Sequence, residues 1–149
     1  MKICLVCSQG GHYTQTLQLL DAFSDHTFFF ATYHGPREED INRIAPAYFI
    51  ENIGTSPWRM FLLTLWAFKI LRHERPDIIL SLGSEIAIPF FYLGKLLGIK
   101  TIFIETWSRI DNLSKTAQFV YPVADVFLVQ WPQLLKTCGS KARYEGAVI

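Results

Sequence analysis

The chain has 149 residues, which suits one domain with a hydrophobic core of its own. Fourteen Lys and Arg residues against thirteen Asp and Glu residues give a net charge of +1, and this balance argues against nucleic-acid binding, which requires a basic face. Half of the residues are hydrophobic, 18% are charged and the mean hydropathy is +0.21, so we expect either a large core or apolar surface that meets a membrane or a partner.

Short apolar runs alternate with longer helical patterns along the chain. The apolar runs predict strands at residues 1–7, 27–33, 48–51, 77–82, 100–105 and 125–130. The helical patterns predict helices at residues 14–23, 39–44, 57–73, 85–97, 113–121 and 132–138. Ser84 is the expected N-cap of the fourth helix, and Gly98 closes it. This alternation predicts an α/β fold with a Rossmann-like, doubly wound parallel sheet, and no linker-like stretch divides residues 1–149 into more than one domain.

The cysteines and the N-terminal residues indicate a reducing compartment. Cys4 and Cys7 lie three residues apart in a predicted strand, so their thiols face opposite sides of the sheet and cannot readily pair or share a metal. We therefore expect buried, apolar cysteines. The chain starts directly with a strand-like pattern and shows no signal peptide, which predicts a cytoplasmic location.

The loop after the first predicted strand reads Ser8-Gln9-Gly10-Gly11-His12 and is a candidate ligand site, because ligands of such sheets bind at the carboxyl ends of strands. Gly10 and Gly11 let backbone N–H groups approach a ligand, and the helix start that follows favours an anion such as phosphate. A tight turn without a ligand fits as well. The spacing matches neither the dinucleotide fingerprint nor the Walker loop. His12 is a candidate general base or, alternatively, a residue that caps the helix or contacts a neighbouring loop.

Two later loops end at the same predicted edge of the sheet. Gly83 permits close approach of the backbone, and Ser84 begins a helix whose N–H groups point into the crevice, although an ordinary capped turn has the same pattern. Glu105 closes a buried strand, where a carboxylate requires hydrogen bonds or a partner. It could bind sugar hydroxyls, and Arg109 could bridge a diphosphate, or the two side chains could form a purely structural pair.

The segment at 58–72 is apolar on more than one face of its predicted helix but is too short to span a bilayer. Its aromatic residues and flanking basic residues are typical of a helix that lies in the membrane interface. A crossover helix buried between the sheet and a partner is the alternative. The predicted membrane-contact residues are Trp58, Phe61, Leu62, Leu65 and Trp66.

An ordered set of motifs is similar to one known family. The motifs are Ser8-Gln9-Gly10-Gly11-His12, Pro76-Asp77 with Ser81-Leu82-Gly83, Ile102-Phe103-Ile104-Glu105 with Arg109, Val129-Gln130-Trp131-Pro132 and Tyr144-Glu145-Gly146. Together they resemble the PssD-type polysaccharide biosynthesis proteins over nearly the whole chain. Those proteins resemble the acceptor-side subunit of the split N-acetylglucosaminyltransferase of dolichol-linked oligosaccharide synthesis, and the single-chain enzyme MurG has a similar glycine-rich loop ending in histidine.

The resemblance implies the N-terminal half of a GT-B glycosyltransferase that is divided between two chains. A partner would supply the donor-binding C-terminal half, and together they would transfer a sugar from a UDP-sugar, with inversion, to a polyprenyl-diphosphate-linked acceptor in capsule or exopolysaccharide synthesis. Gly10, Gly11 and His12 would form the active-site loop, with His12 as base. Ser8, Gly83, Ser84, Glu105 and Arg109 are the other expected acceptor- or phosphate-binding residues. No metal or other cofactor is expected.

The resemblance also implies a peripheral position on the inner face of the plasma membrane. The eukaryotic relatives carry an N-terminal membrane anchor that is not seen here, so membrane contact would fall to the 58–72 region. Gln9 stands where relatives often have a smaller residue, which affects the expected phosphate contacts. Two other classes of function stay open: a non-catalytic adaptor that recruits and activates a partner enzyme, and a small enzyme that modifies nucleotide-sugars.

Overall fold

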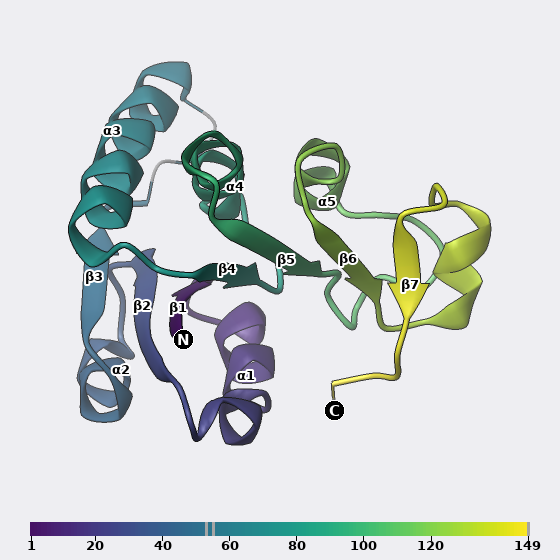
Figure 1. Ribbon diagram of the computed structural model, residues 1–149, viewed down its shortest axis with the longest axis horizontal. Helices are drawn as coiled ribbons and strands as arrows, with labels where there is room; N and C mark the ends of the chain where they lie inside the picture. The colour runs from purple at the N-terminus through teal and green to yellow at the C-terminus, as the bar shows by residue number, and fades with distance from the viewer. Residues whose placement is uncertain (53, 55, 149) are drawn as a thin grey trace.

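The computed structural model describes residues 1–52, 54 and 56–148, and in them the chain forms a seven-stranded sheet (Figure 1). The strands are β1 (Lys2–Val6), β2 (Thr27–Tyr33), β3 (Ala47–Ile50), β4 (Ile78–Ser81), β5 (Lys100–Ile104), β6 (Val126–Val129) and β7 (Ala142–Tyr144). Their order across the sheet is β3-β2-β1-β4-β5-β6-β7, and every neighbouring pair is parallel. The predicted doubly wound parallel sheet is therefore confirmed.

Helices cover both faces of the sheet. The α-helices are α1 (Gly11–Leu17), α2 (Glu38–Ile44), α3 (Pro57–Glu74), α4 (Ala87–Leu97) and α5 (Lys115–Val120), and two short 3₁₀ helices are η1 (Leu20–Phe23) and η2 (Pro132–Lys136). In Figure 1, α3, α4 and α5 lie above the sheet, and α1 and α2 lie below it. Each face has its own hydrophobic core. As predicted, Cys4 is buried in one core and Cys7 in the other.

Aromatic residues fill the larger core, between the sheet and helices α3 to α5. The rings of Phe103 and Phe127 stack across β5 and β6 with centroids 5.3 Å apart. Phe91 of α4 meets Phe103 edge-on, and Tyr121 meets Phe127 in the same way. Burial of each such side chain stabilises the fold by roughly 1.5–3 kcal/mol. This packing fixes β5, whose carboxyl end leads into a loop of the candidate site, against β6.

The structure differs from the sequence prediction at several element ends. The predicted helix at 14–23 is an α-helix from Gly11 to Leu17 and a separate 3₁₀ turn, and the predicted helix at 132–138 is a 3₁₀ helix. Helix α4 begins at Ala87, with Ile86 as its N-cap, so the prediction that Ser84 caps it is wrong. Strand β7 was not predicted, because its three residues are half-buried or exposed and show no apolar run.

Candidate active site

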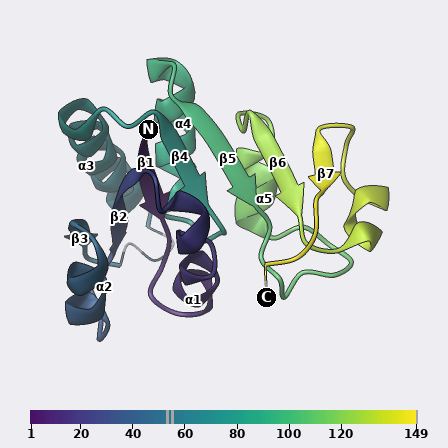
Figure 2. The ribbon, with the colours of Figure 1, turned by 60° about the horizontal axis from the view of Figure 1, so that its bottom comes forward.

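A pocket of about 340 Å³ opens at the carboxyl edge of the sheet. The edge lies where the strand order reverses, because β2 and β3 extend the sheet on one side of β1 while β4 follows on the other, and such points bind ligands. The loops after β1, β4 and β5 supply its walls (Figure 2 shows these strands ending at one edge). The lining residues are His12, Ser84, Glu85, Thr106, Ser108 and Arg109, together with residues 114–116.

The pocket brings together three of the residues that the sequence predicted for the site. They are His12, Ser84 and Arg109. The other predicted residues, Ser8, Gly10, Gly11, Gly83 and Glu105, lie in or next to the same loops but do not line it. At Gly10 and Gly11 nothing lies within 4 Å of an added Cβ, so this stretch of the loop is open.

His12 is the second residue of α1, and its half-buried imidazole packs against the loop after β4. A Cβ atom on Gly83 would lie 2.6 Å from Cε1 of the ring, so only glycine lets the two loops approach this closely. The Nδ1 atom is buried and has no hydrogen-bond partner among the described residues. Burial lowers the pKa of His12, and the Leu82 carbonyl and the Glu85 carboxylate partly oppose this. His12 is therefore neutral at pH 7, as a general base must be.

Gln9 of the first loop points away from the pocket. Its side-chain amide donates to the carbonyl of Tyr33 at 2.8 Å, and its carbonyl oxygen accepts from the N–H of Arg37 at 2.9 Å. Tyr33 is the last residue of β2, and Arg37 directly precedes α2. Gln9 therefore fixes the first loop to its neighbour and leaves the backbone of Gly10 and Gly11 unobstructed.

The loop between β4 and α4 has a strained backbone. Gly83 has a φ of 126°, and Ser84 has a φ of 77°, which is uncommon for a residue other than glycine. Such a conformation costs of order 1–3 kcal/mol and persists only where the surroundings fix it. The buried Ser81 hydroxyl holds the turn by donating to the Gly83 carbonyl and accepting from the Gly83 N–H. The Ser84 hydroxyl donates to the Glu85 carboxylate instead of capping the helix.

Glu105 is fully buried beneath the pocket. Its two carboxylate oxygens accept hydrogen bonds from the backbone N–H groups of Thr106 and Ser114, each at 2.8 Å. Burial raises the pKa of Glu105, and these two N–H groups oppose that rise. No ion pair joins Glu105 to Arg109 in the described part of the chain, so the proposed structural pair is not formed. In this conformation Glu105 shapes the loop rather than facing a bound sugar.

Two residues of the site were not predicted from the sequence. Gln15 of α1 donates to the Thr106 hydroxyl and accepts from the N–H of Trp107 and from the side chain of Gln130. These partners follow Gln15 by about a hundred residues in the sequence, and no local pattern indicates such a contact. Glu85 was overlooked as a lining residue because the pattern around it predicts a helix start. Gln15 ties α1 to the loop after β5, and Glu85 ties the β4–α4 loop to Tyr33 of β2.

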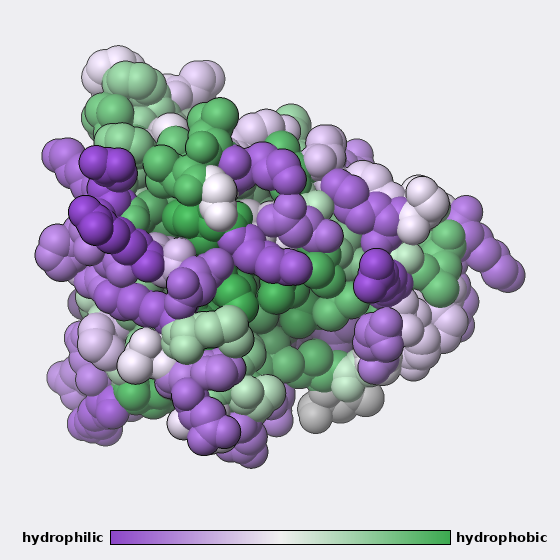
Figure 3. All heavy atoms as spheres, viewed as in Figure 1, coloured by the Kyte–Doolittle hydropathy of each residue, from purple (hydrophilic) through white to green (hydrophobic). Residues whose placement is uncertain are grey.

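The side chains predicted to contact a membrane form one stripe along α3. Trp58 is 66% exposed, Phe61 is 51% exposed, and Leu62 and Leu65 are each 45% exposed. Trp66 differs, because it is half-buried and packs edge-on against Phe90 of α4 with ring centroids 5.9 Å apart. Figure 3 shows hydrophobic surface over α3 and α4. Within the described residues, none of the helices combines the length and apolar character that crossing a bilayer requires.

The site combines a neutral imidazole, hydroxyl groups and charges of both signs. Arg109 and Lys115 supply positive charge, and Glu85 supplies negative charge. Such a set suits a ligand that carries both phosphate and hydroxyl groups. Among the described residues, no cluster of three or more His, Cys, Asp or Glu side chains could hold a metal ion.

The parallel sheet and the pocket at its switch point define the class of protein: the chain has the fold of the N-terminal half of a GT-B glycosyltransferase. The crystal structure of MurG from Acinetobacter baumannii superimposes with a TM-score of 0.77 at 16% identity, over 96% of this chain and 45% of MurG. A family model described as "Oligosaccharide biosynthesis protein Alg14 like" matches residues 48–148. The chain therefore belongs to the Alg14-like family.

Two curated relatives are named as N-acetylglucosamine transferases or subunits of one. The chain is 26% identical to the human UDP-N-acetylglucosamine transferase subunit ALG14, in an alignment that covers 100% of this chain and 83% of the human protein. It is 32% identical to the UDP-N-acetylglucosamine--N-acetylmuramyl-(pentapeptide) pyrophosphoryl-undecaprenol N-acetylglucosamine transferase of Nitrosomonas europaea, over 60% of this chain and 24% of that enzyme. The chain thus spans most of the human subunit but less than half of the single-chain enzymes.

Proposed function

We propose that this chain is the acceptor-binding subunit of a two-chain, inverting glycosyltransferase that moves N-acetylglucosamine or a related sugar from a UDP-sugar to a polyprenyl-diphosphate-linked acceptor. The observation that carries the proposal is the pocket at the carboxyl edge, which neutral His12 lines together with the cations Arg109 and Lys115. The human relative is named as a subunit of a UDP-N-acetylglucosamine transferase, and the bacterial relative is named for a pyrophosphoryl-undecaprenol substrate. A donor-binding chain would complete the site.

In the proposed reaction His12 acts as the general base. Its Nε2 accepts the proton of the acceptor hydroxyl while that oxygen attacks the anomeric carbon of the donor sugar from the face opposite the leaving UDP. The new glycosidic bond forms as the bond to UDP breaks, which inverts the anomeric centre. Arg109 and Lys115 hold the diphosphate of the acceptor by charge-assisted hydrogen bonds. The open backbone at Gly10 and Gly11 lets the acceptor approach His12.

The biological context is also a proposal. The motif order resembles the PssD-type proteins, which favours capsule or exopolysaccharide synthesis and a position on the inner face of the plasma membrane. Sugar transfer in membranes that carry this chain, its donor-binding partner or both tests the function, with radiolabelled UDP-sugars and lipid-linked acceptor. We expect activity only where both chains are present. Full activity with the partner alone would reduce this chain to an adaptor or anchor.

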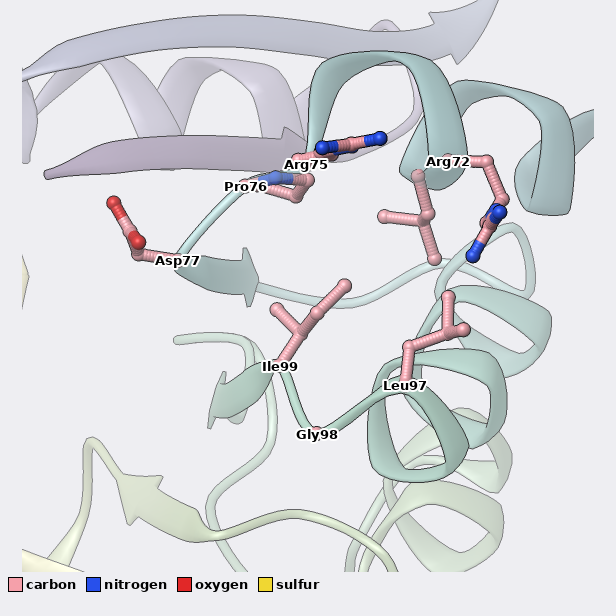
Figure 4. A pocket seen from close by; sticks show the side chains of 8 residues that line it. Arg72, Arg75, Pro76, Asp77, Leu97, Gly98 and Ile99 are labelled. Carbon is pink, nitrogen blue, oxygen red and sulfur yellow. The ribbon is translucent and has the colours of Figure 1, made fainter.

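Helix α3 is the proposed membrane contact. It runs from the carboxyl edge of the sheet, after β3, to the amino edge, before β4, so Trp58 lies at the same end of the molecule as the pocket. At the other end of α3, Arg72 and Arg75 line a second pocket of about 350 Å³ together with Leu97 of α4 (Figure 4). An apolar stripe with basic residues at its end suits a surface of anionic lipid.

Replacing exposed apolar residues of α3 tests this contact. The variants Phe61→Ser and Leu65→Ser are each expected to weaken binding to vesicles of anionic phospholipid by about tenfold, because each removes apolar area worth roughly 1.5 kcal/mol or more when buried. Co-sedimentation with vesicles measures the effect. Ile44→Ser is the matched control, because Ile44 is 41% exposed on α2, below the opposite face of the sheet. An equal loss of vesicle binding in the control, or no loss in either α3 variant, would contradict the membrane contact of α3.

A further inference from the structure

The two walls of the pocket differ in charge. The loop between β4 and α4 contributes Glu85, whereas the loop after β5 and the start of α5 contribute Arg109 and Lys115. Neither Arg109 nor Lys115 forms an ion pair within residues 1–52, 54 and 56–148. A bound diphosphate is therefore attracted to the Arg109 wall and repelled by the Glu85 wall. This difference in charge favours one orientation of a bound acceptor over the other.

Glu85 is fixed in its orientation by two hydroxyl groups. Its Oε1 accepts from the Tyr33 hydroxyl at 3.0 Å, and its Oε2 accepts from the Ser84 hydroxyl at 3.1 Å. A carboxylate offers about four acceptor positions, so each oxygen can accept one further hydrogen bond. Glu85 also forms no ion pair with a described residue, and its side chain is half-buried at the pocket wall. The hydroxyl groups of a sugar are suitable donors for these two remaining positions.

We propose that Glu85 binds the acceptor sugar, accepting hydrogen bonds from its hydroxyl groups, while Arg109 and Lys115 hold the diphosphate of the same acceptor. This assignment rests on the function proposed above. With this assignment the reacting sugar lies near His12 and Glu85. The diphosphate and its lipid lie near Arg109 and Lys115. The assignment of Glu85 also reassigns Gly83 and Ser84, because phosphate at their turn would lie next to the Glu85 carboxylate.

Equilibrium binding to the full chain separates the two walls. The probes are geranyl diphosphate and the same molecule carrying N-acetylglucosamine on its diphosphate. We expect the wild-type chain to bind the sugar-bearing probe about tenfold more tightly, because of charge-assisted hydrogen bonds to Glu85. Glu85→Gln should remove most of this preference and leave the affinity for geranyl diphosphate unchanged or slightly higher. Arg109→Ala should lower the affinity for both probes by the same factor.

Control variants distinguish a loss of binding from a folding defect. Gln has nearly the shape of Glu: its carbonyl oxygen can still accept from one of the two hydroxyl groups, and its amide can donate to the oxygen of the other. Thermal unfolding checks that the variant folds. Glu85→Asp keeps the negative charge on a side chain that is shorter by one methylene, so this variant should lose only part of the preference for the sugar-bearing probe. Glu39→Gln, on α2 with 88% of the Glu39 side chain exposed, is the matched control and should bind both probes like the wild type.

The outcomes distinguish this assignment from the proposed function. If the wild-type chain binds both probes equally, or if Glu85→Gln weakens both by the same factor, Glu85 does not bind the sugar, although the acceptor-side function stands. If the wild-type chain binds neither probe, the acceptor-side function fails and the assignment of Glu85 fails with it.

Discussion

Replacing His12 with alanine is expected to lower the turnover of the reconstituted two-chain enzyme by about 100- to 10,000-fold, which is the usual contribution of a general base. This role fits the structure, because His12 lines the pocket and its Nδ1 is buried with no hydrogen-bond partner among the described residues, so we propose that Nε2 faces the acceptor hydroxyl. Steady-state turnover and co-purification of the two chains are the measurements. Binding to the partner should be unchanged, because the substitution removes only the imidazole.

His26→Ala is the control for this experiment. His26 precedes β2 at the amino edge of the sheet, opposite the pocket, and among the described residues its ring forms a hydrogen bond only with the carbonyl of Asp25. This variant should keep its turnover. Normal turnover in His12→Ala would contradict the base role and favour the adaptor.

The pH dependence gives a second measurement on His12. Its pKa lies below the ordinary value of 6.5, chiefly because burial disfavours the charged ring. A base acts in its neutral form, so kcat/KM should persist at pH 6.5 and fall only as the pH drops through the lowered pKa. In His12→Ala this acid limb should disappear from the residual activity. An unchanged limb would assign it to another group.

Gly83→Ala is the second substitution with a large expected effect. A methyl group at this position would lie 2.6 Å from Cε1 and 2.9 Å from Nδ1 of His12, so the imidazole must move. The φ of 126° adds backbone strain of about 1–3 kcal/mol. We expect turnover to fall nearly as far as in His12→Ala, together with a lower melting temperature. Turnover and thermal unfolding of the reconstituted pair measure the two effects.

Gly98→Ala separates strain from displacement of the histidine. Gly98 also has a positive φ, of 71°, but nothing lies within 4 Å of an added Cβ, and it closes α4 at the amino edge of the sheet. This variant should lose about 1 kcal/mol of stability and keep its turnover. If Gly83→Ala is as active as Gly98→Ala, the close contact between Gly83 and His12 has no catalytic importance.

The central sheet is predictable from the sequence for a physical reason. Strands such as β4 and β5 are covered by helices on both faces, so each reads as a continuous apolar run with Gly or Pro nearby. The carboxyl ends of these strands then locate the candidate loops without any structural information. Strand β7 lacks this signal because it forms an edge of the sheet and its side chains are half-buried or exposed.

The fine geometry of the site could not be read from the sequence. The pattern around Ser84 predicts a capped helix, but the left-handed backbone at Ser84 delays the helix to Ala87 and directs the hydroxyl to Glu85. The position of Glu105 at a strand end was correct, yet its orientation into the interior depends on the N–H of Ser114, nine residues further along the chain. The contact between Gly83 and His12 joins loops that only the folded sheet brings together.

Photoaffinity labelling of the two-chain complex tests the central claim, the division of labour between the chains, most directly. The probes are a polyprenyl diphosphate that carries a benzophenone group and a UDP-sugar that carries an azide on its uracil ring. We expect the acceptor probe to label this chain, in the loops that contain His12 and Arg109, and the donor probe to label the partner. Labelling of the partner alone by the acceptor probe would contradict the account, because this chain would then hold neither substrate.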